Sequence, residues 1–246
     1  MKRTLEKLNL AIAISGGGTT MRSVLLACGC DNMLRRVNPV LIVSNNAGAG
    51  GLDKARICGV ADKDRIVLSR SEYPEDQSFG EALLHECVQR SMDVLVLCGF
   101  LRTVPGFVTD VIESYNQHPG PLDPGHLHFG GQGMHGKAVH QAVLEFAKRI
   151  QRPFCTEASV HVLTAEVDGG PLVGIHPVRL YENDTAGILS DRVLPHEHKL
   201  VINVLYRRSE FGKLRPIKRE NRLVQRNERQ AWLAAIETAK QAYPNG

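Results

Sequence analysis

The sequence predicts an α/β protein built on a doubly wound, mostly parallel β-sheet. Short apolar runs rich in valine, isoleucine and leucine alternate with segments whose apolar residues recur at helical spacing. The first run leads directly into a glycine-rich loop, as at the first strand-to-helix turn of many such folds. Because the runs are apolar at nearly every position, we expect strands covered by helices on both faces of the sheet, in a Rossmann-like arrangement.

The first half of the chain predicts strands and helices in alternation. Residues 8–14 form an apolar run that ends at glycines, which predicts a strand followed by a helix over about 20–30. Residues 40–44 are apolar and partly β-branched, which predicts a second strand. A glycine-rich turn follows, and then a helix through 52–58.

The same alternation continues to the middle of the chain. Residues 65–68 predict a third strand, and the spacing of apolar residues predicts a helix over about 77–90. Residues 93–98 form a nearly continuous apolar run, which predicts a fourth strand at the centre of the sheet.

The pattern changes after residue 115. A loop rich in glycine, proline and histidine, 120–136, leads to a helix over about 137–150. Two further strands are expected at 158–163 and 172–175, antiparallel to each other around a turn that contains Asp168.

The rest of the chain predicts mostly helix. A long helix is expected from about 185 to 206, and 214–217 suggests a possible strand. A last helix places four residues at core spacing: Trp232, Ala235, Ile236 and Ala239. We expect Trp232 to serve packing, not to hold a cofactor.

Length and composition indicate an ordinary globular protein. A chain of 246 residues, 43% hydrophobic and 23% charged, suits one domain, 1–246, with one sizeable core. The net charge of +4 fits a phosphorylated ligand and is too small to require nucleic acid. Much of the excess lies in 207–229, a run that is usually a solvated face. We therefore expect small-molecule substrates, no nucleic acid, and a monomer or homodimer.

The cysteines and the apolar runs predict a cytoplasmic protein. The six cysteines have no Cys-x-x-Cys spacing, and several lie in apolar runs where a reduced thiol behaves as a small hydrophobe: Cys28, Cys30, Cys58, Cys87, Cys98 and Cys155. The apolar run near the N-terminus is too short for a signal peptide. No apolar stretch reaches the roughly 18 residues of a membrane span.

Ten histidines raise the question of a metal site. The pairs His126/His128 and His196/His198 could each supply two ligands. No cysteine or acid is spaced to complete a tetrahedral set around either pair, so we expect no metal.

Three residues suit acyl transfer to an amine. Asn116 and His118 are two positions apart, so on an extended strand both side chains point to the same face. Asp168 lies in an Asp-Gly-Gly-Pro turn after a second predicted strand. An amide, an imidazole and a carboxylate together can stabilise an oxyanion and move a proton. Each also has a purely structural explanation, since such residues often satisfy turns.

The glycine loop 16–20 suits a phosphate. Glycines let the backbone approach a ligand, and the N-terminus of the next helix favours an anion. The alternative is that the glycines only allow the turn. Met21 replaces the third glycine of a dinucleotide motif, and Asn45 follows the second strand where an acid would hold a ribose, which argues against NAD.

Four segments, in order and spacing, resemble the folate-dependent formyltransferases. They are the glycine loop 15–20, Gly99-Phe100-Leu101-Arg102, Asn116-x-His118-Pro119, and Asp168-Gly169-Gly170-Pro171. The resemblance covers roughly residues 8–206, and the two last motifs are the more specific ones. Within the family, the resemblance is greatest to the members that formylate glycinamide ribonucleotide in purine biosynthesis.

The resemblance implies a role for each catalytic residue. Asn116 would donate a hydrogen bond to the formyl oxygen, His118 would stabilise the tetrahedral oxyanion, and Asp168 would fix His118 and assist proton transfer. His161 corresponds to a supporting histidine, although a core histidine on a strand is an equal alternative.

The resemblance also implies the binding residues. The acceptor phosphate would be bound by Gly18, Thr19 and Thr20, and the pterin of 10-formyltetrahydrofolate by Leu101, Arg102 and Val104. Glu197 matches an acid that contacts the acceptor nucleotide. The domain would then consist of a phosphate-binding half (8–112), a catalytic and folate-binding half (113–206) and a basic C-terminal extension (207–246).

The sequence departs from the family pattern at several positions near these motifs. Gly120-Pro121-Leu122-Asp123-Pro124 replaces the usual Ser-Leu-Leu-Pro, and Gly17 and Thr20 stand where asparagine is common. The basic residue expected after the third strand has no clear match near 74–76. These departures bear on the identity of the acceptor amine.

The expected activity is therefore formyl transfer from 10-formyltetrahydrofolate to a primary amine, most closely that of glycinamide ribonucleotide. Methionyl-tRNA formyltransferases would need a further C-terminal domain, and formyltetrahydrofolate hydrolases an N-terminal one. An N-formyltransferase for another amine, such as an amino-sugar nucleotide, is the nearest alternative. A non-catalytic nucleotide- or RNA-binding module is a second, although binding alone needs none of the geometry of Asn116, His118 and Asp168.

Overall fold

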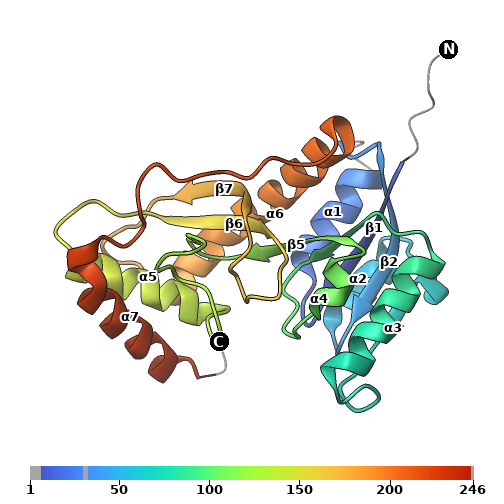
Figure 1. Ribbon diagram of the computed structural model, residues 1–246, viewed down its shortest axis with the longest axis horizontal. Coiled ribbons are helices and arrows are strands. Elements are labelled where there is room, and N and C mark those ends of the chain that lie inside the picture. The colour runs from blue at the N-terminus through green and yellow to red at the C-terminus, as the bar shows by residue number, and fades with distance from the viewer. Residues whose placement is uncertain (1–6, 30–32, 245–246) are drawn as a thin grey trace. The chain divides into compact units, whose positions relative to one another are not determined.

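Seven β-strands form one sheet in the order β3-β2-β1-β4-β5-β6-β7 in the computed structural model, which describes residues 7–29 and 33–244 (Figure 1). The chain divides into two compact units. Unit 1 comprises Met1–Asn116 and Val201–Leu214, and unit 2 comprises Gln117–Leu200 and Arg215–Gly246.

Unit 1 contains the parallel part of the sheet. β1 pairs with β2 on one side and with β4 on the other, β2 pairs with β3, and β4 pairs with β5, all in parallel. The strands are β1 (Leu8–Ile14), β2 (Val37–Ser44), β3 (Arg65–Val67), β4 (Val94–Leu97) and β5 (Glu113–His118), whose last two residues belong to unit 2. The helical segments are α1 (Thr19–Gly29), α2 (Gly50–Ile57), η1 (Asp62–Asp64), α3 (Asp76–Gln89) and α4 (Gly106–Thr109).

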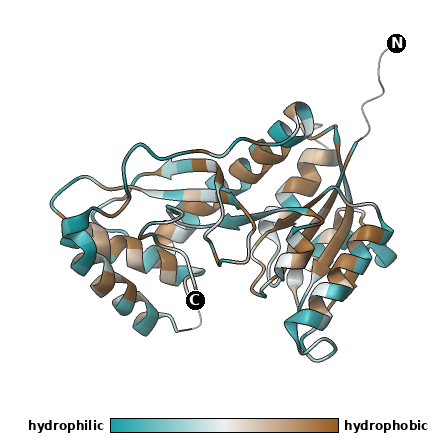
Figure 2. Ribbon diagram, viewed as in Figure 1, coloured by the Kyte–Doolittle hydropathy of each residue, from teal (hydrophilic) through white to brown (hydrophobic). Residues whose placement is uncertain are grey.

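The strands of unit 1 form its core because they are apolar on both faces. Leu10 to Ile14 of β1 are fully buried, and β4 is buried along its whole length. In Figure 2 much of the length of these strands is coloured as hydrophobic. This burial on both faces is the pattern that continuous apolar runs predict for parallel strands.

Unit 2 contains an antiparallel pair of strands and three helices. β6 (Thr156–Val162) and β7 (Leu172–Val178) pair in antiparallel fashion on either side of the turn at Asp168. The helical segments are α5 (Lys137–Arg149), the first part of α6 (Ala186–Phe211), η2 (Arg226–Glu228) and α7 (Arg229–Ala242). α5 and α7 lie side by side (Figure 1).

The expected fold class is confirmed, with differences at the ends of elements. β2 begins at Val37, three residues earlier than expected, and Pro39 lies in it next to a register shift between Leu10 and Ala11. A bulge of this kind accommodates the missing N–H of proline. α6 continues five residues past the expected end, to Phe211. The expected end of the first helix, Cys30, lies outside the described residues.

One expected element is wrong. Residues 214–217 do not form a strand, although the Ile217 N–H donates to the Leu172 carbonyl oxygen at 2.7 Å. A single backbone hydrogen bond does not make a ladder, so the segment is not a strand. Within residues 7–29 and 33–244, no helix has both the length and the apolar character needed to cross a membrane.

Candidate functional site

The glycine loop of unit 1 is held against α2. The Gly51 N–H donates to the Gly16 carbonyl oxygen at 3.0 Å. Gly18 has φ +62°, and a Cβ there would lie 2.7 Å from the Gly51 Cα. Gly18 is therefore required both by its backbone conformation and by this close approach. Gly16 has open space around it, so the open part of the loop lies before Gly18.

Lys54 supplies a cation at this loop. Its Nζ donates to the Gly17 carbonyl oxygen at 2.5 Å. Thr19 is exposed at the start of α1, and Thr20 is buried. The sequence pattern gives no signal for Lys54, because the contact joins α2 to a loop 37 positions earlier. It places a positive charge beside the glycine loop.

The predicted folate segment is tied to the same loop. The Leu101 N–H donates to Ser15 Oγ at 2.8 Å, and the Ser15 N–H donates to the Gly99 carbonyl oxygen at 3.1 Å. Leu101 is 62% exposed and Val104 is buried. Both lie after β4, at its carboxyl end, which is where doubly wound sheets bind ligands.

Arg102 has a structural task in this segment. Its Nη2 donates to the carbonyl oxygens of Tyr73 and Glu75 at 2.6 and 2.9 Å, and its guanidinium lies 4.1 Å from the centre of the Phe79 ring. The side chain is buried and holds the start of α3. The charge of Arg102 is therefore used within the protein, and its assignment to the folate stays a prediction.

Unit 2 brings His118 and Asp168 together. His118 Nε2 lies 3.7 Å from Asp168 Oδ2, and both side chains are almost fully buried. Asp168 also has His161 Nε2 at 3.3 Å from its Oδ1 and accepts a hydrogen bond from the Gly131 N–H at 2.9 Å. His161 thus lies beside Asp168, and its supporting role stays a prediction.

The turn that carries Asp168 is shaped by its own backbone and by glycine. Asp168 has φ +54°, a left-handed conformation that aspartate and asparagine tolerate better than most residues. A Cβ on Gly170 would lie 1.8 Å from the Val162 carbonyl oxygen. The Asp-Gly-Gly sequence therefore reflects steric demands as well as chemistry.

The surroundings of Asp168 keep it charged. Burial alone would raise its pKa, but the positive charge that His118 can carry, with the hydrogen bonds from His161 and Gly131, holds the pKa well below its usual range. Burial and the nearby His118 lower the pKa of His140 of α5 to about 4. A lowered pKa keeps an aspartate charged, but it favours the neutral form of a histidine. The carboxylate is thus the anion that faces His118.

The backbone lies against both ring nitrogens of His118. Nδ1 lies 3.1 Å from the Gly120 N–H, which can only donate, and 3.2 Å from the Gly120 carbonyl oxygen, which can only accept. That carbonyl oxygen already accepts from Ser159 Oγ at 2.8 Å, so the shorter contact favours a neutral ring with its proton on Nε2, which lies 3.4 Å from the Met134 carbonyl oxygen. Asn116 precedes His118 by two positions on β5, so both side chains leave the same face of this strand.

Glu197 is buried against β5. It is 5% exposed on α6 and accepts a hydrogen bond from the Gln117 side chain. Because Gln117 lies between Asn116 and His118 on β5, its side chain leaves the opposite face of the strand. Burial raises the pKa of Glu197 to about 7. A role in contacting the acceptor amine stays a prediction.

Three further histidines make local contacts. His128 Nδ1 accepts the Gly130 N–H at 3.0 Å, and the rings of His176 and His196 stack with centres 4.3 Å apart. Among the residues that the structure describes, no group of three or more histidine, cysteine, aspartate or glutamate side chains is placed to hold a metal ion.

The chain is similar to known formyltransferases. A family model described as formyl transferase matches residues 8–205. The phosphoribosylglycinamide formyltransferase of Escherichia coli is 29% identical over 195 residues, covering 78% of this chain and 83% of that protein. The chloroplastic enzyme of the same name from Arabidopsis thaliana is 30% identical over 202 residues, which is 80% of this chain. The chain spans only 63% of the Arabidopsis relative and 61% of the one from Vigna unguiculata.

Solved structures give the same result. Glycinamide ribonucleotide transformylase 1 of Symbiobacterium toebii has a TM-score of 0.71 at 25% identity, covering 86% of this chain and 95% of that one. Phosphoribosylglycinamide formyltransferase of Brucella melitensis has a TM-score of 0.69 at 27% identity, covering 86% and 100%.

Proposed function

Because the chain belongs to the formyl transferase family, we propose that it transfers a formyl group from 10-formyltetrahydrofolate to the primary amine of glycinamide ribonucleotide, a step of purine biosynthesis. The observation that carries this proposal is the position of Asp168 between His118 and His161, with Asn116 two residues before His118. The acceptor is supported by the names of the relatives.

The chemistry follows from the groups present. The amine nitrogen attacks the formyl carbon, and the electrons of the C=O double bond move to oxygen. The bond from that carbon to N10 of the folate then breaks, and the proton lost by the amine passes to N10. The Nε2–H of His118 and the amide N–H of Asn116 would donate to the developing oxyanion. Asp168 would stabilise the positive charge on His118 while the proton moves.

Binding is assigned to unit 1. Gly18, Thr19 and Thr20, with the open backbone at Gly16 and the cation of Lys54, would hold the phosphate of the amine substrate. The segment from Leu101 to Val104 would hold the pterin, with backbone groups and the exposed Leu101 side chain. Folate is a cosubstrate here, and no step calls for a metal. Cytoplasmic location and a monomeric or homodimeric state stay predictions from the sequence.

A panel of amines tests the proposal. The purified protein is incubated with a formylfolate analogue and, in separate reactions, with glycinamide ribonucleotide, glycinamide without the phosphate, and an amino-sugar nucleotide. Turnover of glycinamide ribonucleotide alone is the expected result. Turnover of only the amino-sugar nucleotide would move the assignment to the nearest alternative, and release of no formyl group to any amine would overturn the proposed activity.

A further inference from the structure

The loop between β5 and α5 makes direct polar contacts with the proposed catalytic pair. Within this loop, residues 120–134, the Gly120 N–H donates to His118 Nδ1 and the Gly131 N–H donates to Asp168 Oδ2. The Met134 carbonyl oxygen lies 3.4 Å from His118 Nε2. The loop contains no helix or strand and has few backbone hydrogen bonds of its own, such as that from the Phe129 N–H to the Pro121 carbonyl oxygen, so contacts from other segments help to fix its shape.

The segment after α6 contacts the first part of this loop. Arg219 Nε donates to the Leu122 carbonyl oxygen at 2.8 Å, and its guanidinium also pairs with Glu157 of β6. The Leu223 N–H donates to Asp123 Oδ2 at 3.1 Å. A charge-assisted hydrogen bond to a carbonyl fixes the backbone of the loop more firmly than a neutral one.

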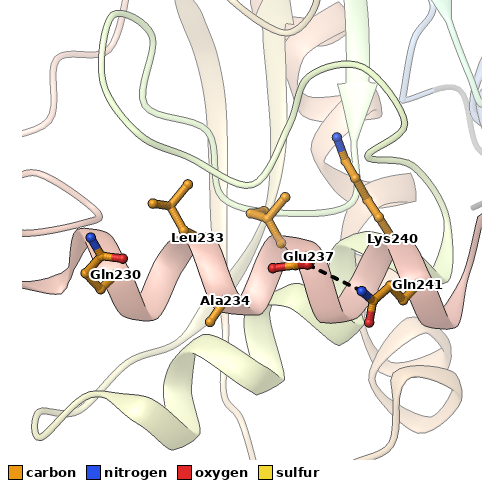
Figure 3. A pocket seen from close by; sticks show the side chains of 7 residues that line it. Gln230, Leu233, Ala234, Glu237, Lys240 and Gln241 are labelled. Atoms are coloured by element: carbon orange, nitrogen blue, oxygen red, sulfur yellow. Dashed lines mark hydrogen bonds between the residues drawn. The ribbon is translucent and has the colours of Figure 1, made fainter.

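α7 contacts the rest of the loop. Trp232 Nε1 donates to the His128 carbonyl oxygen at 2.9 Å. The end of the Lys240 side chain lies over Gly133, 3.7 Å from where a Cβ would stand, and Figure 3 shows this side chain pointing away from α7 toward the loop. His128 and Gly133 lie on either side of Gly131, which contacts Asp168.

α7 is itself rigidly anchored. Arg152, just after α5, pairs with Glu228 at 2.7 Å and donates to the Leu223 carbonyl oxygen at 2.7 Å. Gln225 and Glu228 form a reciprocal capping box at the start of η2, which leads into α7. A helix fixed in this way can hold a loop in one position.

We infer that residues 215–242, which lie outside the part of the chain matched by the family model, position loop 120–134 and through it His118 and Asp168, with Trp232 as the central positioning residue. The inference rests on the proposed function for its kinetic readout. It also joins two features that set this chain apart: the altered loop after His118-Pro119 and the basic extension contact each other.

Trp232→Phe tests the inference, because it removes the N–H donor and keeps an aromatic ring. Loss of one hydrogen bond of about 1 kcal/mol corresponds to roughly a fivefold change, so we expect kcat for formyl transfer to fall about fivefold or more. KM for the amine should stay within about twofold, since unit 1 binds the substrate phosphate. The pH profile of kcat should also shift, because the carboxylate and imidazole would no longer be held at one distance.

Leu233→Ala is the matched control, since Leu233 is the next residue of α7 and is exposed. It should leave kcat and the pH profile unchanged. The inference is overturned if Trp232→Phe lowers only the melting temperature and keeps the wild-type kcat and pH profile at a temperature where it is folded.

A spectroscopic measurement separates this inference from the proposed function. NMR of the histidine ring nitrogens reports the tautomer and hydrogen bonding of His118 without any substrate. If the wild type formylates no amine, the proposed function fails, yet a change of the His118 nitrogen shifts in Trp232→Phe and not in Leu233→Ala still supports positioning. Unchanged His118 nitrogen shifts in both variants would overturn the positioning inference.

Discussion

Asp168 is the residue on which the site of unit 2 converges. His118, His161 and the Gly131 N–H all meet its carboxylate, and their combined effect holds its pKa well below the usual range. The negative charge strengthens each of these interactions, whereas an amide oxygen in the same place could still accept a hydrogen bond. Charge and shape can therefore be separated by one substitution.

Asp168→Asn is the suitable variant, because asparagine also tolerates the φ of +54° at this position. We expect kcat to fall by roughly 10²- to 10⁴-fold, the range typical for loss of a proton-transfer group. The melting temperature should change by only a few degrees. Steady-state kinetics and thermal unfolding measure both. A folded variant with near-normal kcat would remove Asp168 from the mechanism.

Glu197 makes a prediction about stability and pH. Its pKa is raised from 4.5 to about 7 by burial, so the folded state binds a proton that the unfolded state has lost between these values. Stability from this group is therefore present below pH 4.5 and falls as pH rises toward 7. The loss is at most roughly 3 kcal/mol, from 1.36 kcal/mol per pKa unit.

Glu197→Gln should abolish this part of the pH dependence. Glutamine carries no charge and can still accept the hydrogen bond from Gln117. Urea unfolding of both proteins at pH 5, 6, 7 and 8 should show the wild type weakening relative to the variant. Parallel curves would contradict the raised pKa. A rise in KM for the amine in the same variant would support contact between Glu197 and the acceptor.

At the scale of elements, the glycine loop shows how one motif combines packing and binding. Gly18 is needed to let the loop approach Gly51 of α2, so a bulky residue there would damage the fold and say little about ligands. Lys54 of α2, by contrast, reaches the loop with a flexible side chain. Lys54 can therefore be replaced without disturbing the close approach of Gly18 to Gly51.

Lys54→Gln should weaken binding of the phosphorylated amine and spare the folate. A charge-assisted hydrogen bond to phosphate contributes about 1.5–3 kcal/mol, so we expect roughly a 10- to 100-fold loss of affinity for glycinamide ribonucleotide. Calorimetry with each ligand measures the two affinities. Lys63→Gln, a change at an exposed lysine of η1, is the control. Equal losses for both ligands would argue against a phosphate role.

At the scale of the whole molecule, periodicity and local motifs in the sequence predicted the buried strands and the antiparallel pair. The apolar runs of β1 and β4 identify buried parallel strands, and the Asp-Gly-Gly turn identifies the antiparallel pair around it. The contacts between loop 120–134 and residues 215–242 join positions 97 to 104 apart and leave no periodic signal. The contact of Lys54 with Gly17, the hydrogen bond from Gln117 to Glu197 and the hydrogen bonds of Arg102 also leave no periodic signal in the sequence.

Stability of the whole protein should respond to the cosubstrate. A ligand that binds only the folded state adds RT ln(1 + [L]/Kd), about 2.7 kcal/mol at 100 times Kd. For a chain of this size that corresponds to a rise in melting temperature of roughly 5–10 °C. We therefore expect this shift with a formylfolate analogue, measured by differential scanning calorimetry. p-Aminobenzoylglutamate, which lacks the pterin, should give no shift at the same concentration, because the segment Leu101 to Val104 is assigned to the pterin. Equal shifts with both compounds would place recognition on the glutamate tail. A shift with glycinamide ribonucleotide and none with the analogue would leave the acceptor assignment standing and remove folate from the reaction.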